Sequence, residues 1–144
     1  MGLTIRCKKA NDNIDVSYFG FRRLRNMVSV LVGGDWDVHY LGLTDYLPSL
    51  ENTRNKIFYE EFDRETERLI NERKINIKVA DFLLQSDCEG SIHYGACKEI
   101  LKVIGDYDDN LIYGYAGREN PAMFKDFKRV LQACVDQKCD MVWR

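Results

Sequence analysis

LTIRCKKANDNIDVSY, residues 3–18, contains two runs in which apolar and polar side chains alternate. The apolar members are Leu3, Ile5 and Cys7 in the first run and Ile14, Val16 and Tyr18 in the second. A period of two residues is typical of a strand that buries one face, and the polar segment KKANDN between the runs suits a turn. The stretch therefore predicts an antiparallel β-hairpin.

From residue 19 onward, apolar side chains recur every three or four residues, which is typical of helices. The first helix is expected over residues 19–32, where the pair Gly33-Gly34 ends it. The apolar segment 76–85 suits either a short buried helix or a strand, and we favour a helix over residues 79–84. The other expected helices cover residues 49–73, 94–104, the region from 121 onward, and a short stretch within 35–47.

Proline and cap residues mark two of these helix starts. Pro48 breaks the chain before Ser49, a plausible N-cap, and Asn120 caps a last helix that has Pro121 at its first position. The sum is an α+β fold, a mainly helical single domain over residues 1–144 with a small antiparallel sheet. The N-terminal hairpin forms that sheet, and the C-terminal segment DMVWR could join it as a further strand.

Composition and charge restrict the functional classes. The formal net charge is −2 and the pI is about 5.7. General nucleic-acid binders usually carry a strong basic excess, so that class is not expected. No window approaches the roughly 18 apolar residues of a transmembrane helix, and the N-terminus lacks the apolar run of a signal peptide. We therefore expect a cytoplasmic protein that does not bind membranes.

The cysteines favour a reduced protein without a metal. There are five, an odd number in a chain without an export signal, which indicates free thiols. No CxxC pair occurs, and the spacings match no zinc motif. Cys97 and Cys134 fall on apolar helical faces and are interpreted as small core residues. Neither a metal nor a cofactor is predicted.

The segment SDCEGSIHYGACKEI, residues 86–100, resembles half of a calcium loop. With Gly90 at the sixth position of such a loop, Asp87, Glu89 and Ile92 also match. The twelfth position should be a bidentate glutamate, but it is Ala96, and the ion loses two ligands. We interpret the segment as a tight turn followed by the start of a core helix.

A transition-metal site in the same segment would need His93 together with Cys88 and Cys97. Cys97 lies one helical turn after His93, so the two side chains can face the same way. Because Cys97 belongs to the apolar stripe of the helix, we interpret His93 as a residue at the helix start or the edge of the core.

Catalytic motifs are missing from the sequence. It has no GxSxG, P-loop, HExxH or dinucleotide fingerprint, and only two histidines. A carboxylate-based enzyme would have to use acidic turns such as DYDDN, residues 106–110, with a divalent ion. The sequence thus favours a binding protein and leaves a small metal-dependent hydrolase or nuclease as an alternative.

Two segments contain the side chains of a nucleotide or phosphate pocket. Arg22 and Arg25 lie one turn apart on the first predicted helix, so their guanidinium groups can converge on one anion. Tyr113, Tyr115 and Arg118 lie on a glycine-containing loop, where tyrosine can stack on a base and arginine can bind phosphate. The same side chains would also suit a protein interface. Alanine at Arg22 or Arg25 is expected to weaken binding and to leave the melting temperature nearly unchanged.

Three stretches resemble small uncharacterised proteins encoded by phages and prophages of Gram-positive bacteria. They are the opening MGLTIRCKK with IDVSYFGFRRLRNMV, the segment FLLQSDCEGSIHYGACKEILKVIGDYDDN, and the ending YGYAGREN with FKDFKRVLQACVDQKCDMVW. The resemblance covers the chain apart from its charged middle helix. It implies no catalytic residue.

Phage origin, as the resemblance implies it, favours an accessory protein that counters a bacterial antiviral defence by binding. The expected partner is a host defence protein or a signalling nucleotide of host immunity. A structural or regulatory phage protein that acts through self-association, as a homo-oligomer, is the third alternative.

Overall fold

The computed structural model describes residues 2–46, 52–107 and 124–144, and its sheet brings together the two ends of the chain. The strand order is β2-β1-β4-β3, and every pair is antiparallel. The strands are β1 (Gly2–Cys7), β2 (Asn13–Ser17), β3 (Gly90–Ile92) and β4 (Met141–Trp143). The predicted hairpin and the predicted C-terminal strand are both confirmed, and β4 lies between β1 and β3.

Strand β3 is a correction to the sequence prediction. Residues 86–100 were expected to form a turn followed directly by a helix, but Gly90–Ile92 pairs with β4 before the helix begins. Ile92 lies opposite Met141, and both side chains are buried. A strand of three residues is too short to show an alternating pattern, and it forms here because β4 offers a free edge.

The predicted helices are confirmed within the described residues, and their bounds differ from the expected ones by a few positions. Periodic apolar residues decide which face of each helix is buried; in α1, for example, Phe21, Leu24 and Val28 are almost fully buried. The helices are α1 (Tyr18–Val32), α2 (Gly34–Tyr46), α3 (Asn52–Asn71), α4 (Ile77–Leu84), α5 (Tyr94–Ile104) and α6 (Phe124–Gln137).

Side-chain caps explain where three of the helices begin. Ser17 Oγ accepts a hydrogen bond from the Gly20 N–H at 2.9 Å, and Asn76 Oδ1 accepts one from the Lys78 N–H at 2.8 Å. His93 Nδ1 accepts from the Gly95 N–H at 3.2 Å, which confirms its interpretation as a helix-start residue. The predicted caps Ser49 and Asn120 lie outside the described residues.

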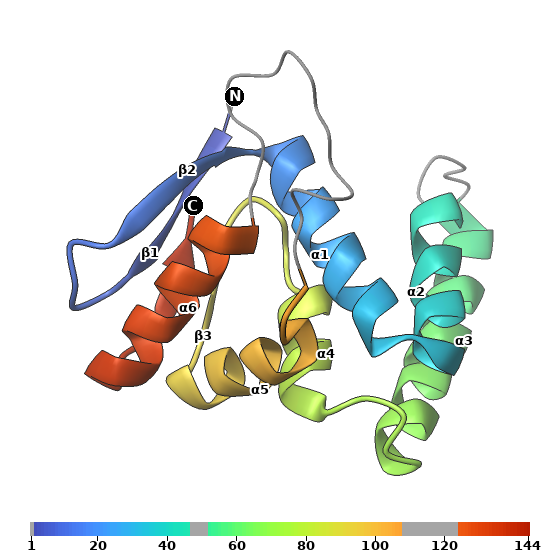
Figure 1. Ribbon diagram of the computed structural model, residues 1–144. Coiled ribbons are helices and arrows are strands. Elements are labelled where there is room, and N and C mark those ends of the chain that lie inside the picture. The colour runs from blue at the N-terminus through green and yellow to red at the C-terminus, as the bar shows by residue number, and fades with distance from the viewer. Residues whose placement is uncertain (1, 47–51, 108–123) are drawn as a thin grey trace.

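The sheet packs against α6, and α1 connects this layer to the pair α2–α3, which projects to one side (Figure 1). Helices α4 and α5 lie between them. An aromatic cluster joins the layers: Phe21, Phe82 and Trp143 contact one another with ring centroids 5.5–6.0 Å apart, and Phe127 stacks on Phe82 at 5.9 Å. Because this cluster holds α1, α4, α6 and β4 together, it fixes the position of the loop that follows α4. None of the helices in the described ranges is both long and apolar enough to cross a membrane.

Candidate functional site

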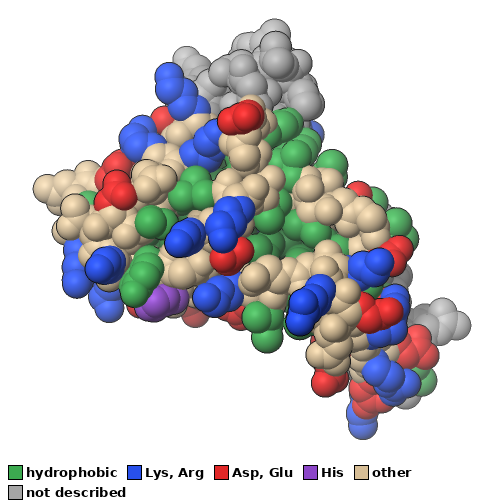
Figure 2. All heavy atoms as spheres, turned by 60° about the horizontal axis from the view of Figure 1, so that its bottom comes forward, with side chains coloured by type: hydrophobic (Ala, Val, Ile, Leu, Met, Phe, Trp, Pro, Cys, Tyr) green, Lys and Arg blue, Asp and Glu red, His purple; other side chains and the backbone are tan. Residues whose placement is uncertain are grey.

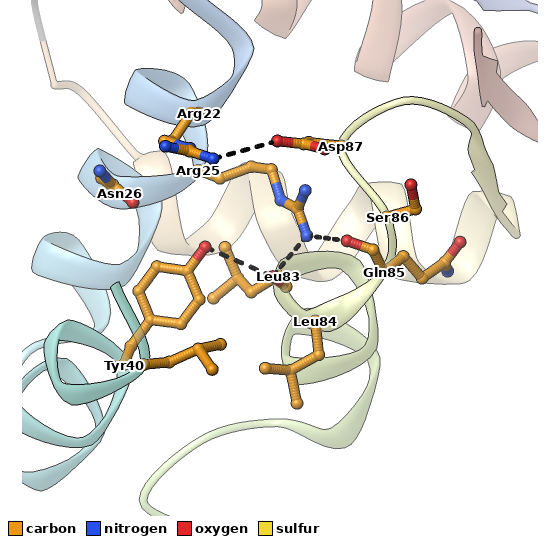
Figure 3. Close-up of a pocket in the computed structure, with 10 residues that line it drawn as sticks. Arg22, Arg25, Asn26, Tyr40, Leu83, Leu84, Gln85, Ser86 and Asp87 are labelled. Atoms are coloured by element: carbon orange, nitrogen blue, oxygen red, sulfur yellow. Dashed lines mark hydrogen bonds and ion pairs between the residues drawn. The ribbon is translucent and has the colours of Figure 1, made fainter. Parts of the chain in front are cut away.

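A pocket of about 240 Å³ lies between α1, α2 and the loop that follows α4 (Figure 3). Its apolar wall is built by α2 and α4, from Tyr40, Leu43, Leu83 and Leu84. Its polar wall is built by α1 and by the loop after α4, from Arg22, Arg25, Asn26, Gln85, Ser86 and Asp87. The predicted contacts Arg22 and Arg25 therefore line one pocket.

Arg25 lies inside the wall of this pocket. Its side chain is 5% exposed, and Nη2 donates hydrogen bonds to the carbonyl oxygens of Leu83 and Gln85 (Figure 3). The last carbonyls of a helix have no partner within the helix, so Arg25 caps the C-terminus of α4 and lies at the negative end of its dipole. The guanidinium also lies over the Phe21 ring, 5.3 Å from its centroid.

Burial changes the protonation properties of the pocket wall. Desolvation lowers the pKa of the Arg25 guanidinium, and the nearby Tyr40 and Asp87 oppose this effect. Desolvation also raises the pKa of the Tyr40 hydroxyl, which donates a hydrogen bond to the Leu83 carbonyl oxygen at 3.3 Å. The wall thus presents a cation and a neutral phenol.

Two polar atoms of the pocket wall have no hydrogen-bond partner among the described residues. They are Arg25 Nε and Asn26 Oδ1, and both are buried. A buried polar group without a partner destabilises the fold by about 1–3 kcal/mol, so such a group usually has a partner such as water or a ligand. The unpaired Nε–H belongs to the Arg25 guanidinium, so this group keeps one donor that no described residue uses.

Arg22 differs from Arg25 because it lies at the mouth of the pocket. Its side chain is 52% exposed, and Nη2 lies 3.5 Å from Asp87 Oδ2 (Figure 3). An exposed ion pair of this kind stabilises a protein by at most about 1 kcal/mol. Arg22 can therefore leave Asp87 and turn toward a bound anion at little energetic cost.

The described residues contain only part of the predicted site. Tyr113, Tyr115 and Arg118 lie outside the described residues, so their position relative to Arg22 and Arg25 stays a prediction. Sequence reasoning missed the contribution of α2 and of the loop after α4. No local sequence pattern connects Tyr40 or Asp87 with the two arginines of α1.

The half calcium loop forms a turn in the structure. Ser86 Oγ accepts a hydrogen bond from the Cys88 N–H at 3.1 Å, and Asp87 faces Arg22. Cys88 is exposed, whereas Cys97 is fully buried in α5. Both observations agree with the interpretation of this segment as architectural.

One group of possible metal ligands occurs in the described part of the chain, and it lies outside this pocket. The three thiols of Cys7, Cys134 and Cys139 are buried, and their sulfur atoms lie within 4.8 Å of one another. The expectation that Cys97 and Cys134 are core residues is confirmed, because neither is measurably exposed.

Comparisons of the chain with protein-family models, curated proteins and solved structures found no match. The geometry of the pocket is therefore the basis for the functional argument.

Proposed function

We propose that this chain is a non-enzymatic binding protein that holds a phosphate-bearing ligand, a nucleotide, in the pocket between α1, α2 and the loop after α4. One observation carries the proposal: Arg22 and Arg25, one turn apart on α1, both line a single concave pocket. Arginine is suited to phosphate because its planar guanidinium presents several donors to the oxygens.

The size of the pocket limits which part of the ligand it encloses. Its volume of about 240 Å³ lies below the roughly 300–1,000 Å³ of pockets for drug-sized ligands. A phosphate and its sugar therefore fill it, and the base lies at the mouth. Tyr113, Tyr115 and Arg118 remain part of the proposal as contacts for that base.

The biological setting comes from the sequence resemblance. In a phage protein, the bound nucleotide would be a signalling nucleotide of host immunity, sequestered in the cytoplasm of the infected cell. Binding alone achieves this effect, so the proposal needs neither a catalytic residue nor a cofactor.

Because Arg25 is buried, its substitution is expected to change the melting temperature, whereas that of Arg22 is not. Arg22 is exposed, so Arg22→Ala should weaken binding with little change in melting temperature. Arg25 caps α4 from inside the core, so Arg25→Ala, which leaves the Leu83 and Gln85 carbonyl oxygens without this donor, should lower the melting temperature. Only the Arg22 substitution therefore tests binding without also changing stability.

The first measurement is native mass spectrometry of the gently purified protein, followed by titration calorimetry with linear and cyclic nucleotides. Arg22→Ala should lose one charge-assisted hydrogen bond of about 1.5–3 kcal/mol. This loss should weaken nucleotide binding roughly tenfold to a hundredfold. Arg64→Ala, at an exposed position of α3, is the matched control and should bind like the wild type. A bare mass together with no nucleotide binding would refute the proposal, as would equal binding by Arg22→Ala.

A defence protein as the partner is the second candidate, and exposed apolar side chains favour it. Val38 and Leu41 lie three residues apart on α2 and are 73% and 46% exposed, and Ile57 on α3 is 59% exposed. Apolar side chains also reach the surface between interspersed charges on the face in Figure 2. Val38→Asp should then abolish inhibition of a purified defence complex without affecting nucleotide binding.

The same preparations test the two remaining alternatives. A metal-dependent hydrolase should show a higher melting temperature with millimolar Mg²⁺, Mn²⁺ or Ca²⁺. Self-association should appear in the native mass at micromolar protein concentration, whereas a monomer would count against that alternative.

A further inference from the structure

Four of the five cysteines lie together in the core, although they come from four separate parts of the chain. Cys7 ends β1, Cys97 lies in α5, Cys134 lies in the last turn of α6, and Cys139 follows that helix. The sulfur atoms of Cys7, Cys134 and Cys139 lie within 4.8 Å of one another, and the Cys97 thiol of α5 lies near that of Cys134. All four residues are at most 5% exposed.

The end of α6 brings two of these thiols together. The Cys139 N–H donates to the Cys134 carbonyl oxygen at 3.1 Å, and the Lys138 N–H donates to that of Val135 at 3.3 Å. With the positive φ of 50° at Lys138, this is a Schellman motif, in which the side chains at the positions of Cys134 and Cys139 meet. The motif makes a local pair from two cysteines that are five residues apart.

Strand pairing adds the third thiol. Cys7 lies opposite Met141 in the β1–β4 ladder, and the Lys8 N–H donates to the Asp140 carbonyl oxygen at 3.0 Å. The end of β1 therefore lies beside the chain that leaves α6. Helix α5 packs against α6 and brings Cys97 near Cys134.

We propose that Cys7, Cys134 and Cys139 bind a thiophilic metal ion, Zn²⁺, with Cys97 as the fourth ligand. In a tetrahedral site with Zn–S bonds of about 2.3 Å, the sulfur atoms are about 3.8 Å apart, so the thiols of Cys7, Cys134 and Cys139 need to approach one another by about 1 Å at most. Cys97 lies outside this group of three and would have to move closer to complete the site. Four protein ligands without an open position make a structural site rather than a catalytic one. The ion would fasten the end of β1 to α5 and α6, and this inference is independent of the nucleotide pocket.

The test refolds the reduced wild-type protein with one equivalent of Zn²⁺ or Co²⁺, which avoids slow entry into a closed core. We expect about one bound metal per chain by elemental analysis, and a thiolate-to-cobalt charge-transfer band with the visible bands of tetrahedral Co²⁺. Less than about a tenth of an equivalent of metal in the folded wild type, with no such band, would overturn the proposal.

Variants identify the ligands. Cys139→Ser should lose the bound metal and the charge-transfer band, while Cys88→Ser, at the exposed cysteine, should keep both. Circular dichroism shows whether each variant is folded, and a folded Cys139→Ser protein that retains the cobalt spectrum would overturn the proposal. Cys97→Ser should lower the affinity, and unchanged affinity would remove Cys97 from the site.

Discussion

Arg25 shows how a single buried cation can be accommodated without a carboxylate in contact. Its guanidinium lies between two aromatic rings and the carbonyl end of α4, where the helix dipole is negative. These contacts compensate part of the cost of removing the charge from water. Arg22, one turn earlier, is exposed and forms only a surface ion pair with Asp87, so it can turn toward an anion. The same residue type therefore serves the fold at one position and the proposed function at the other.

His39 is a second residue whose surroundings decide its chemistry. Its ring stacks on Phe62, with centroids 4.0 Å apart, and Nε2 lies 2.7 Å from Thr66 Oγ1. Since the Thr66 hydroxyl donates its proton to the Phe62 carbonyl oxygen, Nε2 must carry the proton that it shares with Thr66. Burial lowers the pKa of His39 below its usual 6.5; Glu65 opposes this effect and Arg68 adds to it.

This lowered pKa predicts that the protein loses stability as the pH falls. Below about pH 6.5, His39 binds a proton in the unfolded chain before it does so in the folded chain, so protonation favours unfolding. The stabilisation is complete above pH 6.5 and is lost as the pH falls toward the folded pKa. Urea unfolding between pH 7 and 5.5 measures this slope.

The matched variants are His39→Phe, which keeps the aromatic stack, and His93→Asn, which keeps the cap of α5. His39→Phe should flatten the dependence on pH, and His93→Asn should retain the slope that His39 contributes. An unchanged slope in His39→Phe would show that other groups cause it.

At the scale of elements, β3 is held by its pairing with β4 and also by the Gln85 side chain, which precedes it in the sequence. Gln85 Nε2 donates to the Ser91 carbonyl oxygen at 2.8 Å, and Gln85 Oε1 accepts from the Ser91 N–H at 3.2 Å. One amide side chain thus pairs with both backbone groups of Ser91. Gly90 lies opposite Trp143, whose indole N–H donates to the Ser86 carbonyl oxygen at 3.0 Å. The loop after α4, which lines the pocket, is therefore held at its start by the Trp143 indole and at its end by the Gln85 amide.

The packing at Gly90 predicts that even a methyl group destabilises this element. A Cβ there would lie 2.6 Å from Trp143 Cε2 and 2.7 Å from Gln85 Oε1, and the indole is held in the aromatic cluster. Gly90→Ala should reduce the free energy of unfolding by about 1–3 kcal/mol, which thermal or urea unfolding would detect.

Gly42→Ala on α2 is the control for Gly90→Ala. A Cβ at Gly42 meets no atom within 4 Å, so this helical substitution should stabilise the protein by about 0.5–1 kcal/mol. Equal stability of the two variants would contradict the packing argument.

At the scale of the whole molecule, the last strand holds the two ends of the chain together. β4 pairs with β1 on one side and with β3 on the other, and Trp143 contacts Phe21 and Phe82 in the aromatic cluster. Contacts between residues so distant along the chain require the closure of long loops, which costs entropy and slows folding.

Deletion of residues 141–144 should therefore abolish folding rather than merely shorten the sheet. The loss of a buried tryptophan alone costs about 3–5 kcal/mol, and the deletion also leaves β3 without a partner and β1 paired with β2 alone. Near-ultraviolet circular dichroism and thermal unfolding should show no cooperative transition. Arg144→Ala, which changes an exposed side chain, should fold normally. A truncated chain with a cooperative transition near the wild-type temperature would contradict the central role of β4.

The hairpin and the helices could be predicted because each has a local signal. Alternation in residues 3–18 and the spacing of Phe21, Leu24 and Val28 depend on neighbours a few positions away. The two arginines of the candidate site could be found in the same way, since Arg22 and Arg25 share one helix. Tyr40 and the loop after α4 belong to segments with no local relation to α1.

By itself the sequence determined which segments are helices and which form the hairpin, because hydrophobic periodicity acts within one element. Only the tertiary structure decided that Arg25 is buried against Leu83 and Gln85, residues 58 and 60 positions away. It also decided that β4 lies between β1 and β3, and that four cysteines with no motif spacing share one place in the core. The physical reason is that the apolar face of a helix or strand can be buried in many different arrangements. The sequence pattern of one element therefore does not specify which other element packs against it.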